Sequence, residues 1–144
     1  MRALLLPGFL SLCLLLASPA HAQGAAPSHA DRDAIRSVIQ AQLEAFRRDD
    51  AAGAYAEAAP GIRQMFPTPE IFLDMVRRGY PPVYRPRSAE FTRLDTEDGQ
   101  VVQHVEIVGP DGETHTAIYT MEREPDGTWR IAGCVLTQGV RVGT

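Results

Sequence analysis

Two histidines and a glutamate are the side chains in this sequence best suited to acid–base chemistry. His104 and Glu106 lie two residues apart, and His115 follows after a Gly-Pro-Asp-Gly turn. If Val108 pairs with Glu113 across that turn, the two histidines and the glutamate converge on one face of a sheet. Because imidazole titrates near neutral pH and both group types bind metals, the cluster indicates an acid–base pair or a metal site. The alternative is an exposed polar cluster, and since no third ligand of known spacing accompanies it, we expect no metal.

A second group of candidates lies where tyrosines and arginines alternate with prolines. Tyr80, Tyr84, Arg85 and Arg87 fall within eight residues of one another. Guanidinium and phenol groups together can hold a carboxylate or a phosphate, so we assign these four as candidate binding residues. The alternative is that the arginines pair with acids on a solvated helix end. The chain contains no lysine, so its arginines can cluster without a functional reason.

Motifs of several common catalytic classes are absent from the sequence. It contains no glycine-rich phosphate loop, no H-E-x-x-H, no C-x-x-C and no nucleophile elbow. We therefore expect no cofactor. Cys134 has no neighbour in the sequence that would activate its thiol. We therefore expect it to be a small buried residue of a strand and not a nucleophile.

The segment Pro60–Arg87 connects the helical and strand-forming parts of the chain. It holds six of the eleven prolines, so it cannot form one continuous helix or a central strand. Thr68 as N-cap predicts a helix over Pro69–Arg78, ended by Gly79. The prolines that follow predict an extended, polyproline-like path over Tyr80–Pro86.

Helical periodicity precedes this segment. Apolar residues recur at helical spacing after the start signals Ser28 and Asp31, and they form the stripe Ile35, Val38, Ile39, Leu43 and Phe46. A second helix over Ala51–Ala59 is expected to end at Pro60 and Gly61.

Beyond Arg87 the period becomes two, and three Asp-Gly turn signals separate four strands. The expected strands are Ser88–Asp95, Gln100–Val108, Glu113–Glu124 and Thr128–Gln138. Their short connections require an antiparallel meander. The sequence therefore predicts an α+β fold in which N-terminal helices pack in a curved, cone-like four-stranded meander.

Both faces of this sheet carry apolar residues. We expect the core to centre on Ile35, Ile39, Leu43, Phe46, Phe72, Trp129 and Ile131. The pairing assumed above leaves the opposite face without helices, and this face carries Tyr119, Met121, Ala132, Cys134 and Leu136. Such a patch predicts a homodimer interface.

The first 22 residues have the pattern of a signal peptide. Arg2 precedes an apolar run over residues 3–16, and Ala20-His21-Ala22 forms a cleavage signal. We expect cleavage after Ala22 and a periplasmic or secreted protein; the alternative, a membrane anchor, is opposed by the shortness of the run. The expected organisation is then a flexible arm over residues 23–30, a single domain over 31–140 and a tail over 141–144.

Charge limits the classes of partner. Without residue 2 the chain has 13 arginines against 18 acidic residues, a net charge of −5. An acidic protein of this kind is not expected to bind nucleic acid.

Three stretches together resemble a known family: TPEIFLDMVRRGYPPVYRPR, AIRSVIQAQLEAFRRDD and DGTWRIAGCVL. They are similar to the bacterial domain-of-unknown-function family 4864, usually grouped with the nuclear-transport-factor-two-like (SnoaL-like, cystatin-like) superfamily. The resemblance implies a sheet wrapped round a long first helix, with a cavity at the open end of the cone. Members of that superfamily include isomerases, dehydratases and epoxide hydrolases, and others that only bind or that dimerise through the sheet.

Two hypotheses for the function follow. The first is non-catalytic binding of a small molecule or protein partner in a cleft between Pro60–Arg87 and the sheet, which the absence of a catalytic motif favours. The alternative is a cofactor-free isomerase, lyase or hydrolase acting on a small organic substrate. In that case His104 or His115 is the base, and Tyr119 or an arginine polarises a carbonyl.

Overall fold

A fully capped helix starts the described part of the chain. The computed structural model of the protein describes residues 26–138, so the predicted signal peptide and tail lie outside the described residues. Helix α1 spans His29–Arg47, and therefore the last two residues of the predicted arm are already helical. The Ser28 hydroxyl accepts a hydrogen bond from the Asp31 N–H, and the Asp31 carboxylate accepts one from the Ser28 N–H. This capping box confirms the predicted start signals.

Four shorter helices follow: α2 Ala51–Ala56, α3 Pro60–Met65, α4 Pro69–Gly79 and α5 Pro81–Tyr84. The prediction for α4 is confirmed, including the Thr68 cap, whose hydroxyl accepts from the Ile71 N–H at 3.2 Å. The helix expected over Ala51–Ala59 is shorter than predicted, because α2 ends at Ala56, and Pro60 is the first residue of a further helix, α3. A proline fits there since the first helical turn needs no N–H donor.

The polyproline path expected after Gly79 is also wrong. Pro81 and Pro82 form the first turn of α5, in which the N–H of Tyr84 donates to the Tyr80 carbonyl at 2.9 Å. The N–H of Arg85 donates to the Pro81 carbonyl at 3.0 Å. Two prolines are compatible with this turn for the reason that holds at Pro60: their fixed φ is helical and their missing N–H groups have no partner in a first turn.

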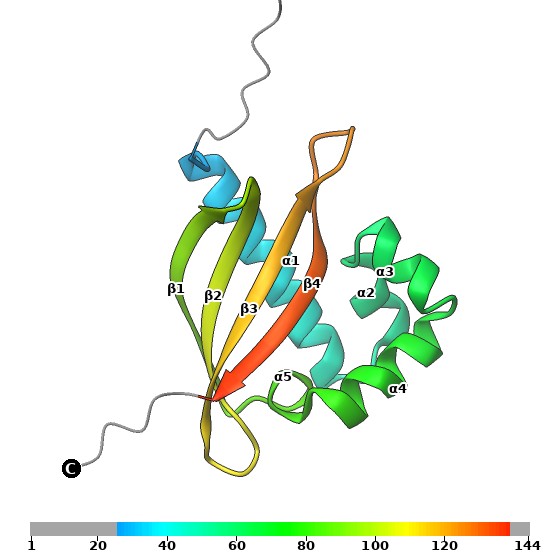
Figure 1. Ribbon diagram of the computed structural model, residues 1–144. Coiled ribbons are helices and arrows are strands. Elements are labelled where there is room, and N and C mark those ends of the chain that lie inside the picture. The colour runs from blue at the N-terminus through cyan, green and yellow to red at the C-terminus, as the bar shows by residue number, and fades with distance from the viewer. Residues whose placement is uncertain (1–25, 139–144) are drawn as a thin grey trace, which may run out of the picture.

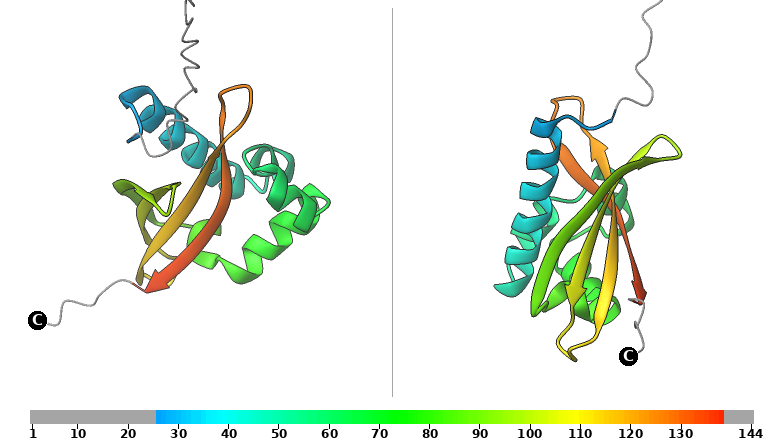
Figure 2. Two further views of the ribbon diagram at one scale, coloured as in Figure 1. Left: turned by 45° about the horizontal axis from the view of Figure 1, so that its top comes forward. Right: turned by 90° about the vertical axis from the view of Figure 1, so that its left-hand side faces the viewer.

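The four strands are β1 Ser88–Glu97, β2 Gln100–Val108, β3 Thr114–Arg123 and β4 Trp129–Gln138. They form one open antiparallel sheet in the order β1-β2-β3-β4, which confirms the predicted meander and the α+β class. Helix α1 crosses one face of the sheet, and α2, α3 and α4 form a lobe beyond the β4 edge (Figures 1 and 2).

The strand register differs from the predicted one by a single residue. Val108 pairs with Thr114, because the loop closes with a hydrogen bond from the Gly109 N–H to the Glu113 carbonyl at 2.9 Å. The β3–β4 loop is likewise longer than assumed, and Arg123 pairs with Trp129. Since neighbouring residues of a strand point to opposite faces, this slip exchanges the two faces of β3 relative to β2.

The helix-covered face therefore includes the residues expected to form a dimer interface. Tyr119 is 1% exposed and Met121 4% exposed, and both belong to the core beneath the helices. The predicted placement of Tyr119 and Met121 on an uncovered face is thus wrong, while Ala132, Cys134 and Leu136 are partly buried, and the homodimer itself stays a prediction. The predicted core is confirmed at every residue named, because all seven are buried.

The helical lobe is tied to the sheet at one residue of β4. The N–H of Ile131 donates to the Glu57 carbonyl at 2.9 Å, and the Ile131 carbonyl accepts from the Ala59 N–H at 2.8 Å. These bonds make a short parallel bridge between Ala58 and Ile131. Immediately after it, a bulge shifts the β3–β4 pairing from Met121–Ile131 to Thr120–Gly133.

Trp129 connects the sheet to the start of α1. Its indole N–H donates to the Asp31 carboxylate at 3.2 Å, and the residue is 8% exposed. We expect Trp129→Ala to lower the free energy of unfolding by about 3–5 kcal/mol, the usual loss for a buried large aromatic. Urea denaturation measures this, with Trp129→Phe as the control that removes the hydrogen bond but keeps most of the apolar contact. A change below about 1 kcal/mol in the alanine variant would contradict this assignment to the core.

The Asp31 carboxylate gives stability a specific pH dependence. Hydrogen bonds from Ser28, and then from Trp129, together with nearby Arg123, hold the pKa of Asp31 below its usual value. A lowered folded-state pKa contributes stability that is present above the unfolded pKa of about 3.9 and lost as the pH falls through the folded pKa. The stability difference between wild type and Asp31→Asn should therefore be constant near neutral pH and shrink below about pH 4. Asp33→Asn, an exposed carboxylate of the same helix, is the control; a gap independent of pH would contradict this role of Asp31.

Candidate functional site

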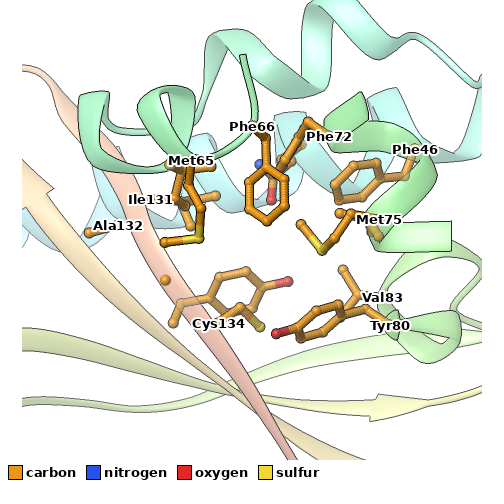
Figure 3. Close-up of a pocket in the computed structure, with 15 residues that line it drawn as sticks. Phe46, Met65, Phe66, Phe72, Met75, Tyr80, Val83, Ile131, Ala132 and Cys134 are labelled. Atoms are coloured by element: carbon orange, nitrogen blue, oxygen red, sulfur yellow. The ribbon is translucent and has the colours of Figure 1, made fainter. Parts of the chain in front are cut away.

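A cavity of about 230 Å³ lies between the helical lobe and the strands β3 and β4. Figure 3 shows that apolar and aromatic side chains surround it. The principal ones are Phe46, Met65, Phe66, Phe72, Met75 and Ile131. The predicted cleft between Pro60–Arg87 and the sheet corresponds in place to this cavity.

Phe72 is the centre of the aromatic wall. Its ring centroid lies 6.1 Å from that of Phe46, 5.8 Å from that of Tyr55 and 6.2 Å from that of Phe66, and all three pairs are tilted. Tilted contacts at these distances are favourable for aromatic rings. Rings from four consecutive parts of the chain thus hold one wall of the cavity in place.

The turn that carries Phe66 is braced by polar contacts from outside the cavity. The Tyr55 hydroxyl contacts the carbonyl oxygens of Phe66 at 2.8 Å and Arg63 at 3.1 Å. The Arg63 guanidinium donates to the Ala58 carbonyl at 3.0 Å and lies over the Tyr55 ring. Because these groups satisfy one another, the wall does not depend on a ligand for its shape.

Few polar groups reach the cavity. Tyr119 lines it, and the neighbour of its buried hydroxyl is the Cys134 thiol, a weak acceptor that makes no hydrogen bond of normal geometry with it in the structure of residues 26–138. Burial raises the pKa of Tyr119 well above its ordinary value, so the group is a neutral phenol. The Gln42 side chain also lines the cavity, and its amide nitrogen donates to the Ala54 carbonyl at 3.2 Å. Its oxygen is therefore the atom left as an acceptor.

Cys134 and Tyr80 complete the polar part of the lining. Burial raises the pKa of the Cys134 thiol to about 12, so this residue is a neutral thiol at physiological pH. Of the four predicted binding residues, Tyr80 is the one that lines this cavity.

Tyr84 and Arg85, by contrast, close the end of α1. The Arg85 guanidinium contacts the Phe46 carbonyl and forms an ion pair with Asp49 at 3.0 Å. The Tyr84 hydroxyl donates to the same carboxylate, which holds the pKa of Asp49 below its usual value. Asp49 has a left-handed φ of 52°, and these contacts stabilise that turn. Both predicted binding residues are thus occupied by internal partners.

Arg87 has a structural partner too. Its guanidinium donates to the Pro110 carbonyl at 2.7 Å, and its backbone N–H donates to the Val108 carbonyl at 2.8 Å. The residue therefore fixes the β2–β3 loop next to the start of β1.

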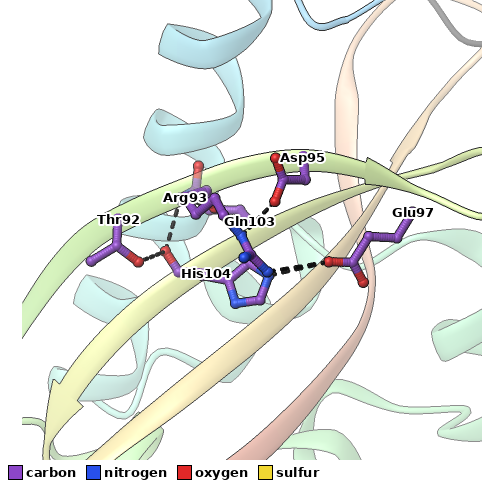
Figure 4. A network of polar contacts seen from close by, with 6 residues as sticks. All are labelled: Thr92, Arg93, Asp95, Glu97, Gln103 and His104. Carbon is purple, nitrogen blue, oxygen red and sulfur yellow. Dashed lines mark hydrogen bonds and ion pairs between the residues drawn. The ribbon is translucent and has the colours of Figure 1, made fainter.

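His104 lies on the sheet face that the helices do not cover (Figure 4). Its Nε2 atom lies 3.2 Å from an Arg93 guanidinium nitrogen and 3.5 Å from a Glu97 carboxylate oxygen. Thr92 and Gln103 bond to its backbone carbonyl. This residue is part of a surface network and does not line the cavity.

His115 lies on the other face from His104, opposite Ile107. Its Nε2 atom is buried without a hydrogen-bond partner, but the residue does not line the cavity. Glu106 pairs with Thr116 instead. The predicted convergence of the two histidines and Glu106 is therefore wrong, because the one-residue register slip separates them onto opposite faces.

One group in residues 26–138 has the spacing of a metal site. Ligand atoms of Asp95, Glu97 and His104 lie within 4.8 Å of one another. The Arg93 guanidinium contacts all three, including a close ion pair with Asp95 and a 3.5 Å approach to Glu97. Its positive charge takes the position that a cation would need, so this arrangement does not fit a metal.

A comparison with protein families identifies the family of this chain. The model of the family described as domain of unknown function DUF4864 matches residues 28–143. The chain belongs to the DUF4864 family. No curated protein and no solved structure matches this DUF4864 chain at a significant level. Among the described residues of the DUF4864 chain, no helix is both long and apolar enough to span a membrane.

Most of the cavity lining in this DUF4864 chain escaped sequence reasoning. Met65, Phe66 and Met75 were not assigned as site residues, although all three lie in the proline-rich segment Pro60–Arg87. The signal that could have identified them is the presence of two methionines and two phenylalanines in a segment that prolines interrupt. Methionine is common at adaptable apolar binding surfaces.

The raised pKa of Cys134 predicts low thiol reactivity. At pH 8 a free cysteine of pKa about 8.5 is roughly one quarter thiolate, whereas a thiol of pKa about 12 has about one part in ten thousand. Alkylation of Cys134 by iodoacetamide should therefore be about a thousandfold slower than in denaturing urea, as followed by peptide mass spectrometry. Labelling at equal rates in the folded and the unfolded chain would contradict the buried position of the thiol.

Arg85 should matter for stability and not for ligand binding. Arg85→Lys loses the planar fork that reaches both the Phe46 carbonyl and Asp49, so we expect the melting temperature to fall by several degrees. Arg78→Lys, at a side chain that is 76% exposed, is the matched control. If the Arg85→Lys protein melts like wild type but loses ligand affinity, this result would contradict the structural role and support the predicted role of Arg85 in binding.

Proposed function

We propose that this DUF4864 chain is an exported, non-catalytic binding protein whose cavity takes up an uncharged, mainly apolar group. The group is a small molecule or a side chain of a protein partner. The observation that carries this proposal is an apolar cavity whose lining includes Tyr119, with a buried hydroxyl that has only the weak Cys134 thiol beside it. Leaving a buried hydroxyl unpaired is unfavourable by about 1–3 kcal/mol, and because a thiol is only a weak acceptor, a ligand that pairs with the hydroxyl recovers part of this energy.

The size of the cavity supports a small ligand. A protein cavity of about 150 Å³ is known to accept benzene, which has six non-hydrogen atoms. The cavity here, at about 230 Å³, is expected to accept on the order of ten. This corresponds to one substituted aromatic ring or a short branched chain.

The lining supports a neutral ligand. Within residues 26–138, no ionisable side chain lines the cavity apart from Tyr80, Tyr119 and Cys134, and the last two are neutral. The nearby Arg63 and Arg85 are engaged with carbonyl groups and with Asp49. A charged ligand would lose its hydration without finding an opposite charge, which disfavours a carboxylate or a phosphate.

The positions of the histidines favour binding over proton-transfer chemistry. A cofactor-free isomerase or lyase needs a base within hydrogen-bond reach of its substrate. Neither His104 nor His115 lines the cavity. Tyr119 remains suited to donate a hydrogen bond to a carbonyl or hydroxyl group, which is a recognition role.

Two wider proposals accompany this function. Export is supported by the apolar run and the Ala20-His21-Ala22 signal at the start of the sequence. A relationship to the nuclear-transport-factor-two-like superfamily is supported by the order of elements, with a long first helix packed on an antiparallel sheet that follows it.

A matched pair of ligands tests the proposed function. 4-Ethylphenol and 4-ethyltoluene have the same shape, and only the phenol can pair with Tyr119. We expect 4-ethylphenol to bind about fivefold more tightly, which corresponds to about 1 kcal/mol for one hydrogen bond. Chemical-shift titrations of the ¹⁵N-labelled protein measure both affinities.

Tyr119→Phe provides the decisive variant. Because the thiol is a weak acceptor, removing the Tyr119 hydroxyl should change the stability of the free protein little, and it should abolish the preference for 4-ethylphenol. His104→Ala is the control, because that side chain lies on the opposite face of the sheet, and its preference should be unchanged. Failure of both ligands to bind at millimolar concentration, or a phenol preference that survives in Tyr119→Phe, would overturn the proposal.

A further inference from the structure

The two edges of the sheet differ in how they are protected. Edge strand β1 carries Glu90, Arg93, Asp95 and Glu97, and a register shift between Phe91 and Leu94 disrupts its ladder. Charges and bulges of this kind prevent another strand from adding to an edge. Edge strand β4 has no charged residue from Ile131 to Gln138, where its sequence is IAGCVLTQ. Only one of the two edges is therefore protected against strand addition.

Backbone groups on the outer side of β4 are paired at its beginning and not beyond. At Ile131 they bond to Glu57 and Ala59, which run parallel to β4. The chain then turns away at Pro60 to begin α3. Among residues 26–138, no backbone group outside the sheet bonds to β4 after Ile131. Alternate N–H and C=O groups of this stretch therefore remain available to an additional strand.

The cavity opens directly onto this unpaired stretch. Ala132, Gly133 and Cys134 form part of its lining, opposite Met65 and Met75 of the helical lobe. Side chains of a strand alternate between the two faces of a sheet. A strand added beside β4 would thus direct one side chain towards the helical face, where Ile131 and Cys134 bound the cavity. Met65 is 71% exposed at the rim and can adapt to the entering group.

We propose that β4 is a docking edge for an extended peptide, which pairs with Ala132–Gln138 and places one large uncharged side chain in the cavity. The inference rests on the proposed function for the cavity and adds the class of partner, a strand-forming segment of another protein. Unpaired backbone groups specify this class, because they require a regular row of donors and acceptors that only another backbone supplies. The bridge at Ile131 already shows this pairing within the chain itself.

A blocked peptide, acetyl-Lys-Thr-Val-Phe-Val-Thr-Lys-amide, is the probe. Its terminal lysines remain in water and its central phenylalanine matches the cavity. The control is the same peptide with N-methyl groups on the three central residues, which keeps every side chain but removes the strand hydrogen bonds. We expect N-methylation to weaken binding at least tenfold. Amide hydrogen exchange should slow at alternate residues of Ala132–Gln138 and stay unchanged in β1, the internal control.

Each outcome separates this inference from the proposed function. Equal binding of both peptides, or slowed exchange in β1 as well as β4, overturns strand addition. If neither peptide binds while 4-ethylphenol still does, the docking edge is wrong and the cavity proposal stands; if none of the three binds, both are wrong. If the β4 amides are already protected in the full chain and lose protection in a chain ending at Gln138, residues 139–144 occupy the edge, which also overturns the proposal.

Discussion

Two backbone hydrogen bonds at Ile131 determine how the halves of this protein fit together. Through them the connection between α2 and α3 is fixed to β4, and the helical lobe is held beyond the edge of the sheet. After Ile131 a bulge shifts the pairing of β4, and at Pro60 the other segment leaves β4 to begin α3, so the two segments separate. The space between them is the cavity, so its existence follows from where this pairing ends.

The cavity persists because its walls are satisfied without a ligand. Phe72 packs against three aromatic rings, and Tyr55 and Arg63 bond to the backbone of the turn behind them. These groups cannot move inward without losing those contacts. Tyr119 is the exception, since its hydroxyl is buried in the same wall with only the weak Cys134 thiol beside it. An apolar space with one weakly paired donor is the arrangement expected of a binding site whose ligand supplies a better partner.

Local sequence signals were sufficient for most of the fold. The Ser28–Asp31 capping box, the Thr68-Pro69 start of α4 and the three Asp-Gly turns each act within a few residues, and each was confirmed. The apolar stripe of α1 likewise identified Ile35, Ile39, Leu43 and Phe46 as core residues, although it missed Ala45 and included the partly buried Val38. The double proline at 81–82 was misjudged because polyproline and a first helical turn both accept the same φ.

The candidate site could be predicted only in part, since it depends on register and not on local pattern. One extra residue in the β2–β3 loop moved His115 away from Glu106 and brought Tyr119 under the helices. The arginines were plausible ligand groups, but Arg85 and Arg87 bond to carbonyl groups 39 and 23 residues away, and no local pattern predicts such contacts. Of the four predicted binding residues, Tyr80 lies at the cavity because it belongs to the segment that forms it.

Intermolecular nuclear Overhauser effects from bound 4-ethylphenol test the central claim most directly. If the ligand occupies the cavity, its ethyl and ring protons should show such effects to the ε-methyl groups of Met65 and Met75 and to the ring protons of Phe72. Effects to Val135, which is 60% exposed, or to residues around His104, with none to the two methionines, would place the ligand outside the cavity and contradict the account.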